Sequence, residues 1–354
     1  MTFLNFLFPP DDPLSDILKK ISTVAECNHK RVFLVGGVVR DRLLGIDTKD
    51  IDISVIGSGI EFAHKLAKSL RVDNVIEYPR FGTAMIPYHD KLIEVATARM
   101  EEYETSSRKP QITESSLRND LARRDFTINA MALSLNRENY LELTDYFEGL
   151  KDLNAGIIRT PLDPITTFSE DPLRMLRAVR FATQLNFRIE PNTFKAIEQV
   201  RERIKIISQE RITDEVTKIL MVSESPSRGF ELLQESTLLD LILPEIAALD
   251  GVDQRNGYHH KDVFKHTLQV LDNIAQVSSK FELRLTALLH DVAKPLTKQF
   301  FPDKGWTFYG HEELGAQMIG EIGKRLRLPN KTIEYAAKLT RLHLRPIAIA
   351  SEGI

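Results

Sequence analysis

The hydrophobic pattern of the chain changes its period near residue 160, and this change constrains the fold more than any other feature. Before it, short strand-like runs alternate with helical ones, and the segment 50–55 (DIDISV) has the two-residue period of a half-buried strand. From residue 168 onward the apolar pattern is helical, with breaks at Pro191, Pro226, Pro244 and Pro329. We therefore expect an α+β fold, in which a mixed-sheet head of about 150 residues precedes an all-helical remainder.

Within the head, the sequence predicts helices and strands in alternation. Helices are expected over 14–29, 38–44 and 60–70, and Gly45 is placed to terminate the second of them. Strands are expected over 31–35, 50–55, 75–77, 82–87 and 91–98.

Composition limits the class of protein. Of the 354 residues, 42% are hydrophobic and 27% are charged, which excludes disordered and fibrous chains. The single cysteine, Cys27, can form neither an internal disulfide nor a zinc cluster, as is typical of a reducing compartment. No apolar run approaches the roughly 18 residues of a membrane helix, and MTFLNFLFPP lacks the basic start of a signal peptide. We expect a cytoplasmic protein with no membrane segment.

Charge is nearly balanced over the whole chain but not along it. There are 47 Lys and Arg against 50 Asp and Glu, whereas residues 174–205 contain eight basic and three acidic side chains. This region is either a nucleic-acid surface or a solvated helix face, and its charge pattern favours neither.

Gly36 and Gly37 lie between a predicted strand and a predicted helix. Such a pair lets backbone N–H groups approach an anion closely, and Arg40, one turn further on, could add a charge-assisted hydrogen bond to a phosphate. Taken alone, the pair is more often a plain tight turn.

Two aspartates follow on the next predicted strand. Asp50 and Asp52 share one face of it, because side chains alternate, and Ile51 and Ile53 occupy the other. Two carboxylates this close repel one another unless a cation lies between them, and hard oxygen ligands suit Mg²⁺ carried in with a triphosphate. The alternative is an exposed acidic strand face. Glu94, on a later strand, is equally a third carboxylate of the site or a surface residue.

The block 121–131 (LARRDFTINAM) predicts a helix start that is rich in polar side chains. The adjacent Arg123 and Arg124 beside a capped helix would form a phosphate clamp. Asp125 and Thr127 could equally serve only as helix caps.

The block 170–182 (EDPLRMLRAVRFA) predicts a helix whose first turn contains Asp171 and Arg174. In such a pair the carboxylate accepts from an exocyclic amino group, while the guanidinium donates to a ring acceptor. This order fits C and A and rejects U and G. The alternative is an ordinary i,i+3 salt bridge. Arg177 and Arg180 continue the same stripe of the helix.

Together the four blocks GGVVRDRLLG, DID, RRDFTINA and EDPLRMLRAVRFA resemble the head and neck of class II tRNA nucleotidyltransferases, the CCA-adding enzymes, and of bacterial poly(A) polymerases. The resemblance covers roughly residues 30–245. It implies the nucleotidyltransferase fold of the DNA polymerase β superfamily for the head, followed by a helical neck.

The resemblance also implies a role for each block. Asp50 and Asp52 match the metal-binding catalytic pair. Nucleotide contacts are implied for the triphosphate (Gly37 and Arg40), for the phosphate and ribose region (Arg124 and Asp125) and for the incoming base (Asp171, Arg174, Arg177 and Arg180).

The C-terminal part resembles the metal-dependent phosphohydrolases of the HD family, through LLHDVAKP and FYGHEELGAQ. Its candidate ligands for a divalent metal are His266, His290, Asp291, His311 and His343. The final Asp usual in such sites is not evident before Ile354, so we expect a shortened chain. A purely structural helical bundle is an equal alternative. An active site of this kind would act on phosphoester ends of RNA.

We therefore expect a nucleotidyltransferase head (1–160), a helical RNA-binding neck (161–250) and an HD-like helical domain (251–354). The expected activity is addition of CCA to tRNA 3′ ends from CTP and ATP with Mg²⁺, with a second divalent metal at the HD site. The alternatives are a poly(A) polymerase, a CC-only or A-only enzyme, and an HD phosphohydrolase with a nucleotide-binding head. The stretch ISQERITDEVTKIL favours the tRNA group. Nothing in the sequence indicates an oligomeric state.

Overall fold

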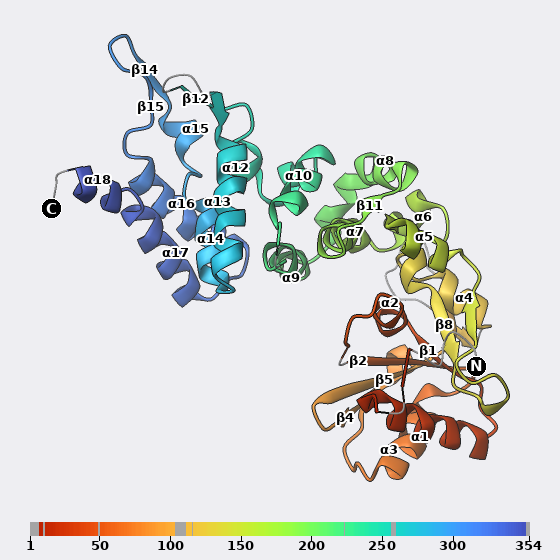
Figure 1. The fold of residues 1–354 in the computed structure, drawn as a ribbon. Helices are drawn as coiled ribbons and strands as arrows, with labels where there is room; N and C mark the ends of the chain where they lie inside the picture. The colour runs from red at the N-terminus through yellow and green to blue at the C-terminus, as the bar shows by residue number, and fades with distance from the viewer. Residues whose placement is uncertain are drawn as a thin grey trace. The chain divides into compact units, whose positions relative to one another are not determined.

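The computed structural model describes residues 7–9, 11–48, 50–102, 111–114, 116–222, 224–255 and 260–351. The chain forms two compact units, Met1–Glu170 and Asp171–Ile354. Each unit is described by itself below (Figure 1). Within the described ranges, no helix is long and apolar enough to span a membrane.

The first unit is built on a mixed sheet of seven strands in the order β3-β4-β5-β2-β1-β8-β9. Its central strands β2 and β5 run parallel, and each of the other neighbouring pairs is antiparallel. The mixed-sheet head is therefore confirmed. The strands are β1 (Val32–Val35), β2 (Asp50–Val55), β3 (Ile76–Tyr78), β4 (Thr83–Tyr88), β5 (Lys91–Thr97), β8 (Met131–Ser134) and β9 (Leu143–Asp145).

Helices cover the sheet of the first unit. α1 (Pro13–Cys27) and α3 (Gly59–Leu70) pack against each other on one face, and α2 (Gly37–Leu43) contacts β1 and β2 (Figure 1). Local sequence explains their ends. The side chains of Asp12 and Ser58 accept hydrogen bonds from the first turns of α1 and α3. Gly45 follows α2 with a φ of +72°, as a helix C-terminus favours. Further elements of this unit are β6 (Arg99–Glu102), β7 (Gln111–Glu114), α4 (Leu117–Ala122), α5 (Gly149–Ala155), β10 (Ile157–Ile158) and α6 (Pro164–Glu170).

The prediction of a helix start in the block 121–131 is wrong. α4 ends at Ala122, Thr127–Asn129 is a single 3-10 turn, and β8 begins at Met131. Asp125 Oδ1 accepts from the backbone N–H of Phe126 at 2.9 Å and from Asn129 Nδ2 at 3.0 Å. Such local side-chain bonds compete with helix formation, and β8 is fully buried beside β1.

The second unit is mainly helical, as predicted, and the prolines mark helix starts. Pro191 and Pro244 are first residues of helices, while Pro226 and Pro329 directly precede others. The helices are α7 (Leu173–Gln184), α8 (Pro191–Val200), α9 (Gln209–Leu220), α10 (Ser227–Glu235), α11 (Leu239–Ile242), α12 (Pro244–Ala247), α13 (Val263–Val277), α14 (Phe281–Leu289), α15 (Lys294–Thr297), α16 (His311–Arg325), α17 (Asn330–Leu342) and α18 (Arg345–Ser351).

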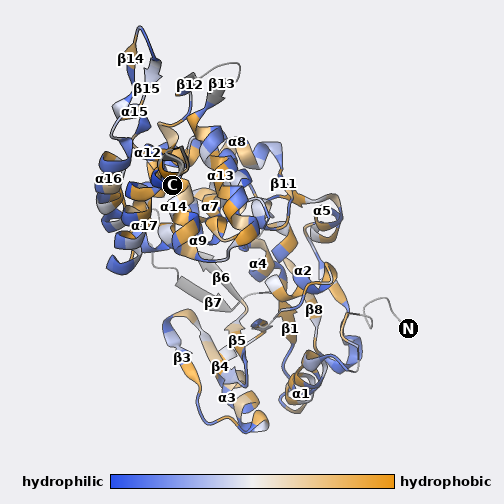
Figure 2. Cartoon of the chain, turned by 60° about the vertical axis from the view of Figure 1, so that its left-hand side comes forward, coloured by the Kyte–Doolittle hydropathy of each residue, from blue (hydrophilic) through white to orange (hydrophobic). Residues whose placement is uncertain are grey.

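Short strands interrupt this helical unit, which the sequence pattern did not predict. They are β11 (Arg188–Ile189) and two hairpins, β12 (Asp253–Arg255) with β13 (His260–Asp262) and β14 (Gln299–Phe301) with β15 (Gly305–Thr307). Apolar residues concentrate on helices such as α7, α13 and α14, which form much of the core (Figure 2).

A buried arginine joins the helices of the second unit. Arg284 of α14 is only 3% exposed. Its guanidinium donates to the carbonyls of Leu220 at 3.1 Å, Ala275 at 3.1 Å and Ser278 at 3.0 Å, at the C-terminal ends of α9 and α13. These carbonyls lack helical partners, and a cation is favourable at a helix C-terminus. Arg284 thereby ties α9 of the predicted neck to α13 and α14 within one compact unit. The boundary near residue 250 stays a prediction.

Candidate functional site

The predicted carboxylates lie in the middle of the head sheet. On β2, Ile51 and Ile53 are buried, while Asp50 is exposed and Asp52 is partly exposed, as the alternation predicts. Glu94 of β5 is the direct neighbour of Asp52 in the parallel register. Glu94 is thus a member of the acidic group and not an isolated surface residue.

The electrostatics of Asp52 show that the negative charge of this acidic group is only partly balanced. Burial raises the pKa of Asp52 to about 6, repulsion by Glu94 and Asp50 adds to the effect, and Arg124 and Arg40 only partly oppose it. A cavity of about 220 Å³ lies here, lined in part by Asp52, Glu94 and Arg124. A set of oxygen ligands that repel one another beside open space fits a divalent cation.

Gly36 lies close to Arg124 and Asp52 of this site. Its φ of +78° lies in the left-handed region that favours glycine. A Cβ at Gly36 would lie 2.7 Å from Arg124 Nη1 and 3.2 Å from Asp52 Oδ2. The predicted Gly-Gly pair therefore does more than form a tight turn, because it leaves room for Arg124 beside Asp52. Gly37 begins α2 directly after it.

Arg40, which we predicted to contact a phosphate, is buried and hydrogen-bonded within the protein. It is 5% exposed, and its Nε donates to Asp41 Oδ1 at 2.8 Å and its Nη1 to Asn129 Oδ1 at 2.7 Å. Asn129 in turn donates to Asp125, so that Asp125 supports this network from a buried position. The contacts of Arg40 and Asp125 with a nucleotide stay predictions.

Asp120 is the residue of this site that sequence reasoning missed. It is 1% exposed and accepts from Arg123 Nη2 at 2.6 Å and from Ser54 Oγ at 3.2 Å, and Arg124 Nη2 lies 3.6 Å away. Although burial opposes ionisation, Arg124 and Arg123 hold the pKa of Asp120 below its usual value. Asp120 therefore positions both arginines. The sequence could have indicated this, because Asp120 precedes Arg123 by three residues and Arg124 by four, the spacing of ion pairs on a helix.

In the second unit, α7 presents the predicted base-recognition residues. Arg174, Arg177 and Arg180 are each half-buried and recur every third residue along one side of the helix. Asp171 Oδ1 accepts from the N–H of Leu173 at 3.2 Å, so that Asp171 also caps the helix. Its role in base recognition stays a prediction.

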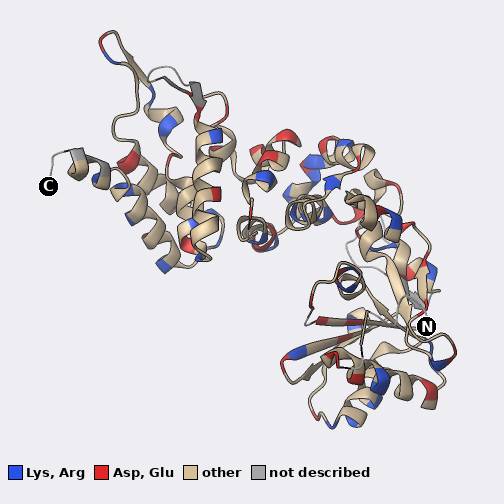
Figure 3. Cartoon of the chain, in the orientation of Figure 1, with Lys and Arg blue, Asp and Glu red and all other residues tan. Residues whose placement is uncertain are grey.

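Glu215 of α9, which sequence reasoning also missed, organises this helix. It is 2% exposed, and its carboxylate lies 2.6 Å from Arg180 Nε and 4.0 Å from Arg177 Nη1. The guanidinium of Arg180 also lies over the Phe181 ring at 4.0 Å. The 174–205 region begins with α7, and its Lys and Arg positions are coloured blue in Figure 3. Some of this charge is neutralised locally, since Lys205 pairs with Glu202 at 2.6 Å.

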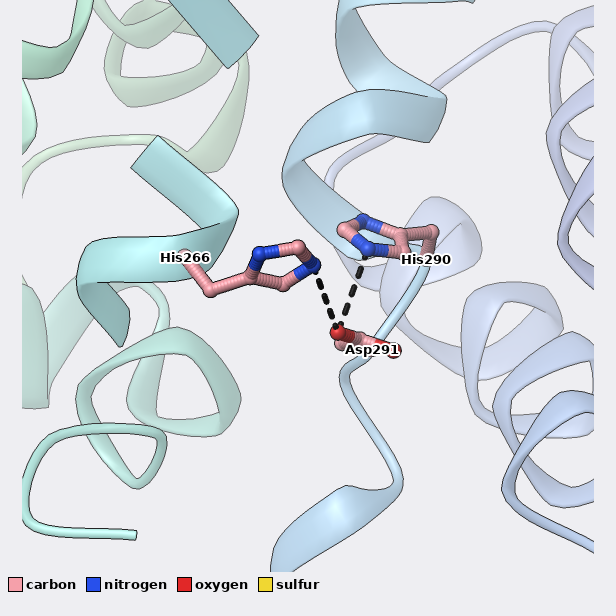
Figure 4. Close-up of side chains that lie close together, drawn as sticks. All are labelled: His266, His290 and Asp291. Carbon is pink, nitrogen blue, oxygen red and sulfur yellow. Dashed lines mark ion pairs between the residues drawn. The ribbon is translucent and has the colours of Figure 1, made fainter. Parts of the chain in front are cut away.

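The five predicted residues of the C-terminal part converge around one carboxylate. Asp291, which is 1% exposed, lies directly after α14. Its Oδ2 is 3.6 Å from Nε2 of His266 and 3.1 Å from Nε2 of His290, and both histidines point toward it (Figure 4). Its Oδ1 is 3.4 Å from Nε2 of His311 and 3.9 Å from Nε2 of His343. Asp291 thus belongs to two groups of three potential metal ligands.

The imidazoles are oriented for metal binding. Nδ1 of His290 lies 2.9 Å from the carbonyl oxygen of Ala287. Likewise, Nδ1 of His311 lies 2.7 Å from the carbonyl oxygen of Phe308, and Nδ1 of His343 lies 2.6 Å from that of Thr340. A carbonyl accepts only from an N–H, so each of these Nδ1 atoms donates to its carbonyl, and Nε2 is the ring nitrogen turned toward Asp291. Burial lowers the pKa of His343, which favours the neutral form.

Asp291 remains a carboxylate in this cluster. Although burial opposes its ionisation, His290 and His311 hold its pKa well below the usual range, and Lys294 Nζ lies 2.7 Å from Oδ2. The four Nε2 atoms and the ionised oxygens of Asp291 are ligand types that suit a divalent metal.

The chain matches three family descriptions in succession. Residues 32–159 match "Poly A polymerase head domain", residues 186–249 match "Probable RNA and SrmB-binding site of polymerase A", and residues 263–352 match "HD domain".

Curated relatives agree with this order. The multifunctional CCA protein of Chromobacterium violaceum is 36% identical over 323 residues, which are 88% of this chain and 74% of that protein. The same-named protein of Neisseria gonorrhoeae is 35% identical over 89% of this chain and 74% of its own length. An A-adding tRNA nucleotidyltransferase of Aquifex aeolicus is 49% identical over 169 residues, but these are only 48% of this chain and 20% of that protein.

Solved structures are similar over most of the chain. The Thermotoga maritima CCA-adding enzyme complexed with tRNA has a TM-score of 0.71 at 25% identity, covering 99% of this chain and 74% of the other. A tRNA nucleotidyltransferase complexed with a primer tRNA and an incoming ATP analog has a TM-score of 0.66 at 31% identity, covering 90% and 83%. The three matched domains and these relatives show that the chain belongs to the family of CCA-adding tRNA nucleotidyltransferases with a C-terminal HD domain.

Proposed function

We propose that the protein adds C and A to the 3′ ends of tRNA from CTP and ATP, without a template. The observation that carries this proposal is the acidic group of Asp50, Asp52 and Glu94 beside Arg124. In the reaction, the primer 3′-oxygen forms a bond to the α-phosphorus, and the bond to the leaving pyrophosphate breaks. Relatives named for CCA addition support the choice of substrate.

The acidic group would hold Mg²⁺, which lowers the pKa of the primer hydroxyl and offsets charge on the pyrophosphate. Arg124, held by Asp120 beside Asp52, is placed to contact the phosphates of the nucleotide. Its charge would also counter the negative charge that the triphosphate brings. Little general-base chemistry is required of the protein itself. A cytoplasmic location fits this substrate.

Three other products of nucleotide addition are alternatives that an assay can distinguish. The partial likeness to an A-adding enzyme keeps A-only addition as an alternative, beside CC-only addition and poly(A) synthesis. Transcripts ending before the tail, at C and at CC, are incubated with Mg²⁺ and each nucleotide in turn. Strict CCA addition supports the proposal, whereas long adenylate tails would identify a poly(A) polymerase.

The same assay tests the catalytic carboxylates. Asp52→Asn keeps the size of the side chain but removes a charged ligand, so we expect transfer to fall by at least about 10³-fold. Asp73→Asn, which changes an exposed aspartate elsewhere in the head, is the matched control and should retain activity. Near-normal turnover of Asp52→Asn would remove Asp52 from the metal site.

Base choice is assigned to Asp171, two residues before α7, and to Arg174 in its first turn. Asp171→Ala removes the acceptor for the amino group of C or A, and a bidentate base contact contributes about 1–3 kcal/mol of discrimination. Selectivity for CTP and ATP over UTP and GTP should therefore fall by roughly 10- to 100-fold. Asp214→Ala, an exposed carboxylate of α9, serves as the control. If Asp171→Ala lowers incorporation of all four nucleotides equally, Asp171 acts only as the helix cap seen at Leu173.

The histidine cluster supports a second activity on the same chain. We propose that His266, His290, Asp291, His311 and His343 hold a divalent metal, and that the cluster hydrolyses phosphoester ends of RNA. The observation that favours it is that Nε2 atoms of four histidines lie around the carboxylate of Asp291.

Metal retention tests this second activity without an enzymatic assay. The full chain is loaded with Mn²⁺ or Ni²⁺, dialysed and analysed for metal content. Asp291→Asn removes the negative charge of the carboxylate that both ligand groups share, and retention should weaken by about 100-fold or more, while nucleotidyl transfer is kept. His64→Gln, an exposed histidine of the head, is the control. Equal retention by Asp291→Asn and the unmodified chain would contradict the assignment.

A further inference from the structure

The hairpin of β14 and β15 lies between two parts of the histidine cluster in the sequence. It connects Asp291 to His311 through residues 294–310. This stretch of seventeen residues (KPLTKQFFPDKGWTFYG) contains five aromatic side chains, three lysines and one aspartate. Aromatics make up only 8% of the chain, so the hairpin is strongly enriched in rings and carries net positive charge.

Three of the five rings of the hairpin are exposed to solvent, whereas Trp306 and Phe308 are half-buried. Phe300 is 59% exposed and Tyr309 is 64% exposed, and Leu296 at the base of the hairpin is 68% exposed. The hairpin extends away from the helices that carry it (Figure 1). Large apolar side chains grouped on a solvent-exposed projection are typical of a binding surface.

The two faces of the hairpin repeat one arrangement. Phe300 and Trp306 are cross-strand partners, with ring centroids 5.2 Å apart, and Lys298 Nζ lies 4.7 Å from the centroid of Trp306. On the other side, Phe301 and Tyr309 have centroids 6.2 Å apart, and Lys304 Nζ lies 5.8 Å from the centroid of Tyr309. Each face therefore combines an edge-to-face ring pair with a cation held over one ring.

The base of the hairpin is tied directly to the histidine cluster. Lys294 Nζ lies 2.7 Å from Asp291 Oδ2 and 5.5 Å from the centroid of the Phe308 ring. The carbonyl of Phe308 accepts from Nδ1 of His311 at 2.7 Å. A ligand held on the hairpin is thus bound to the element that positions the candidate metal ligands.

We propose that this hairpin is a platform for single-stranded RNA, on which unpaired bases stack against the aromatic rings while the lysines contact phosphates. The inference rests on the proposed function only in that RNA is the substrate. Every base has a stacking face, so rings bind single strands with little sequence preference, and interleaved cations track the backbone. A strand end bound here would lie beside the cluster proposed to act on phosphoester ends.

The charge of the hairpin favours RNA over a second copy of the chain. A protein–protein contact would bury the lysines beside the rings and would require acidic partners for them, whereas phosphates supply those partners directly. Association of two copies through the same rings is the competing outcome, and the experiment distinguishes it.

Trp306 is the single tryptophan of the chain, so its fluorescence reports on this hairpin alone. The full-length protein, in chelator, is titrated with an oligouridylate of about eight nucleotides. We expect saturable quenching that weakens as salt is raised. An end-labelled oligonucleotide, followed by anisotropy, gives the affinities of the variants.

Two variants and two controls test the mode of binding. Phe300→Ala removes a stacking ring, and affinity should fall by roughly 5- to 150-fold. Lys298→Gln should lower the salt slope by about 0.7, as expected for one contact to a single-stranded phosphate. Val277→Ala, at a 79% exposed position, and Lys331→Gln, at an exposed one, should bind as the unmodified protein does.

The outcomes separate this inference from the proposed function, because transfer to tRNA is measured on the same preparation. Normal transfer without quenching would overturn the hairpin assignment and leave the proposed function intact. Quenching without transfer would support the hairpin and contradict the proposed function. A change of Trp306 emission with protein concentration alone would show that the rings face a second copy, and would also overturn the proposal.

Discussion

Repulsion between carboxylates on two adjacent parallel strands is the constraint on which the head depends. The register of β2 and β5 places Asp52 directly beside Glu94, in a partly buried position where ionisation is costly. The surrounding structure offsets this cost only in part. Gly36 leaves room for Arg124, and Asp120 holds that arginine from behind. A divalent cation would balance the negative charge that remains. Without the cation, the acidic group destabilises the head, and its function requires this.

The histidine cluster also contains a buried carboxylate, but there the surrounding side chains favour its ionised form. Asp291 is more deeply buried than Asp52, yet it stays ionised because histidines and Lys294 surround it. Backbone carbonyls fix the imidazoles at Nδ1, so their orientation does not depend on an ion. The head presents oxygen ligands suited to Mg²⁺, whereas the cluster offers nitrogen and oxygen ligands suited to transition metals as well. One chain thus contains two sites of different ligand chemistry, each within its own compact unit.

The sequence predicts those parts of the fold and of the candidate site that depend on local hydrophobic periodicity. The alternation in 50–55 correctly placed Asp50 and Asp52 on one face, and the change of period correctly predicted a mixed-sheet head followed by a helical region. The features that the sequence did not predict depend on burial and on contacts between residues far apart in the chain. Asp125 bonds locally to Phe126 and Asn129 and prevents the helix that was predicted there.

Residues that act through another side chain were not predictable in the same way. Glu215 reaches Arg180 across 35 positions in the sequence, and no local pattern indicates that pairing. Asp120 was detectable only as a helical neighbour of Arg123, in a block where the helix was misplaced. The aromatic hairpin was missed because strands of three residues give too short a pattern within a helical region.

Thermal unfolding with and without Mg²⁺ tests the central claim, that the carboxylates of β2 and β5 are held together against their own repulsion. At pH 8, above the raised pKa of Asp52 of about 6, the ionised side chain destabilises the metal-free head. Asp52→Asn should therefore raise the melting temperature in chelator, and Mg²⁺ should stabilise the unmodified protein more than this variant. A variant that melts lower than the unmodified protein in chelator, or an equal effect of Mg²⁺ on both, would contradict the account.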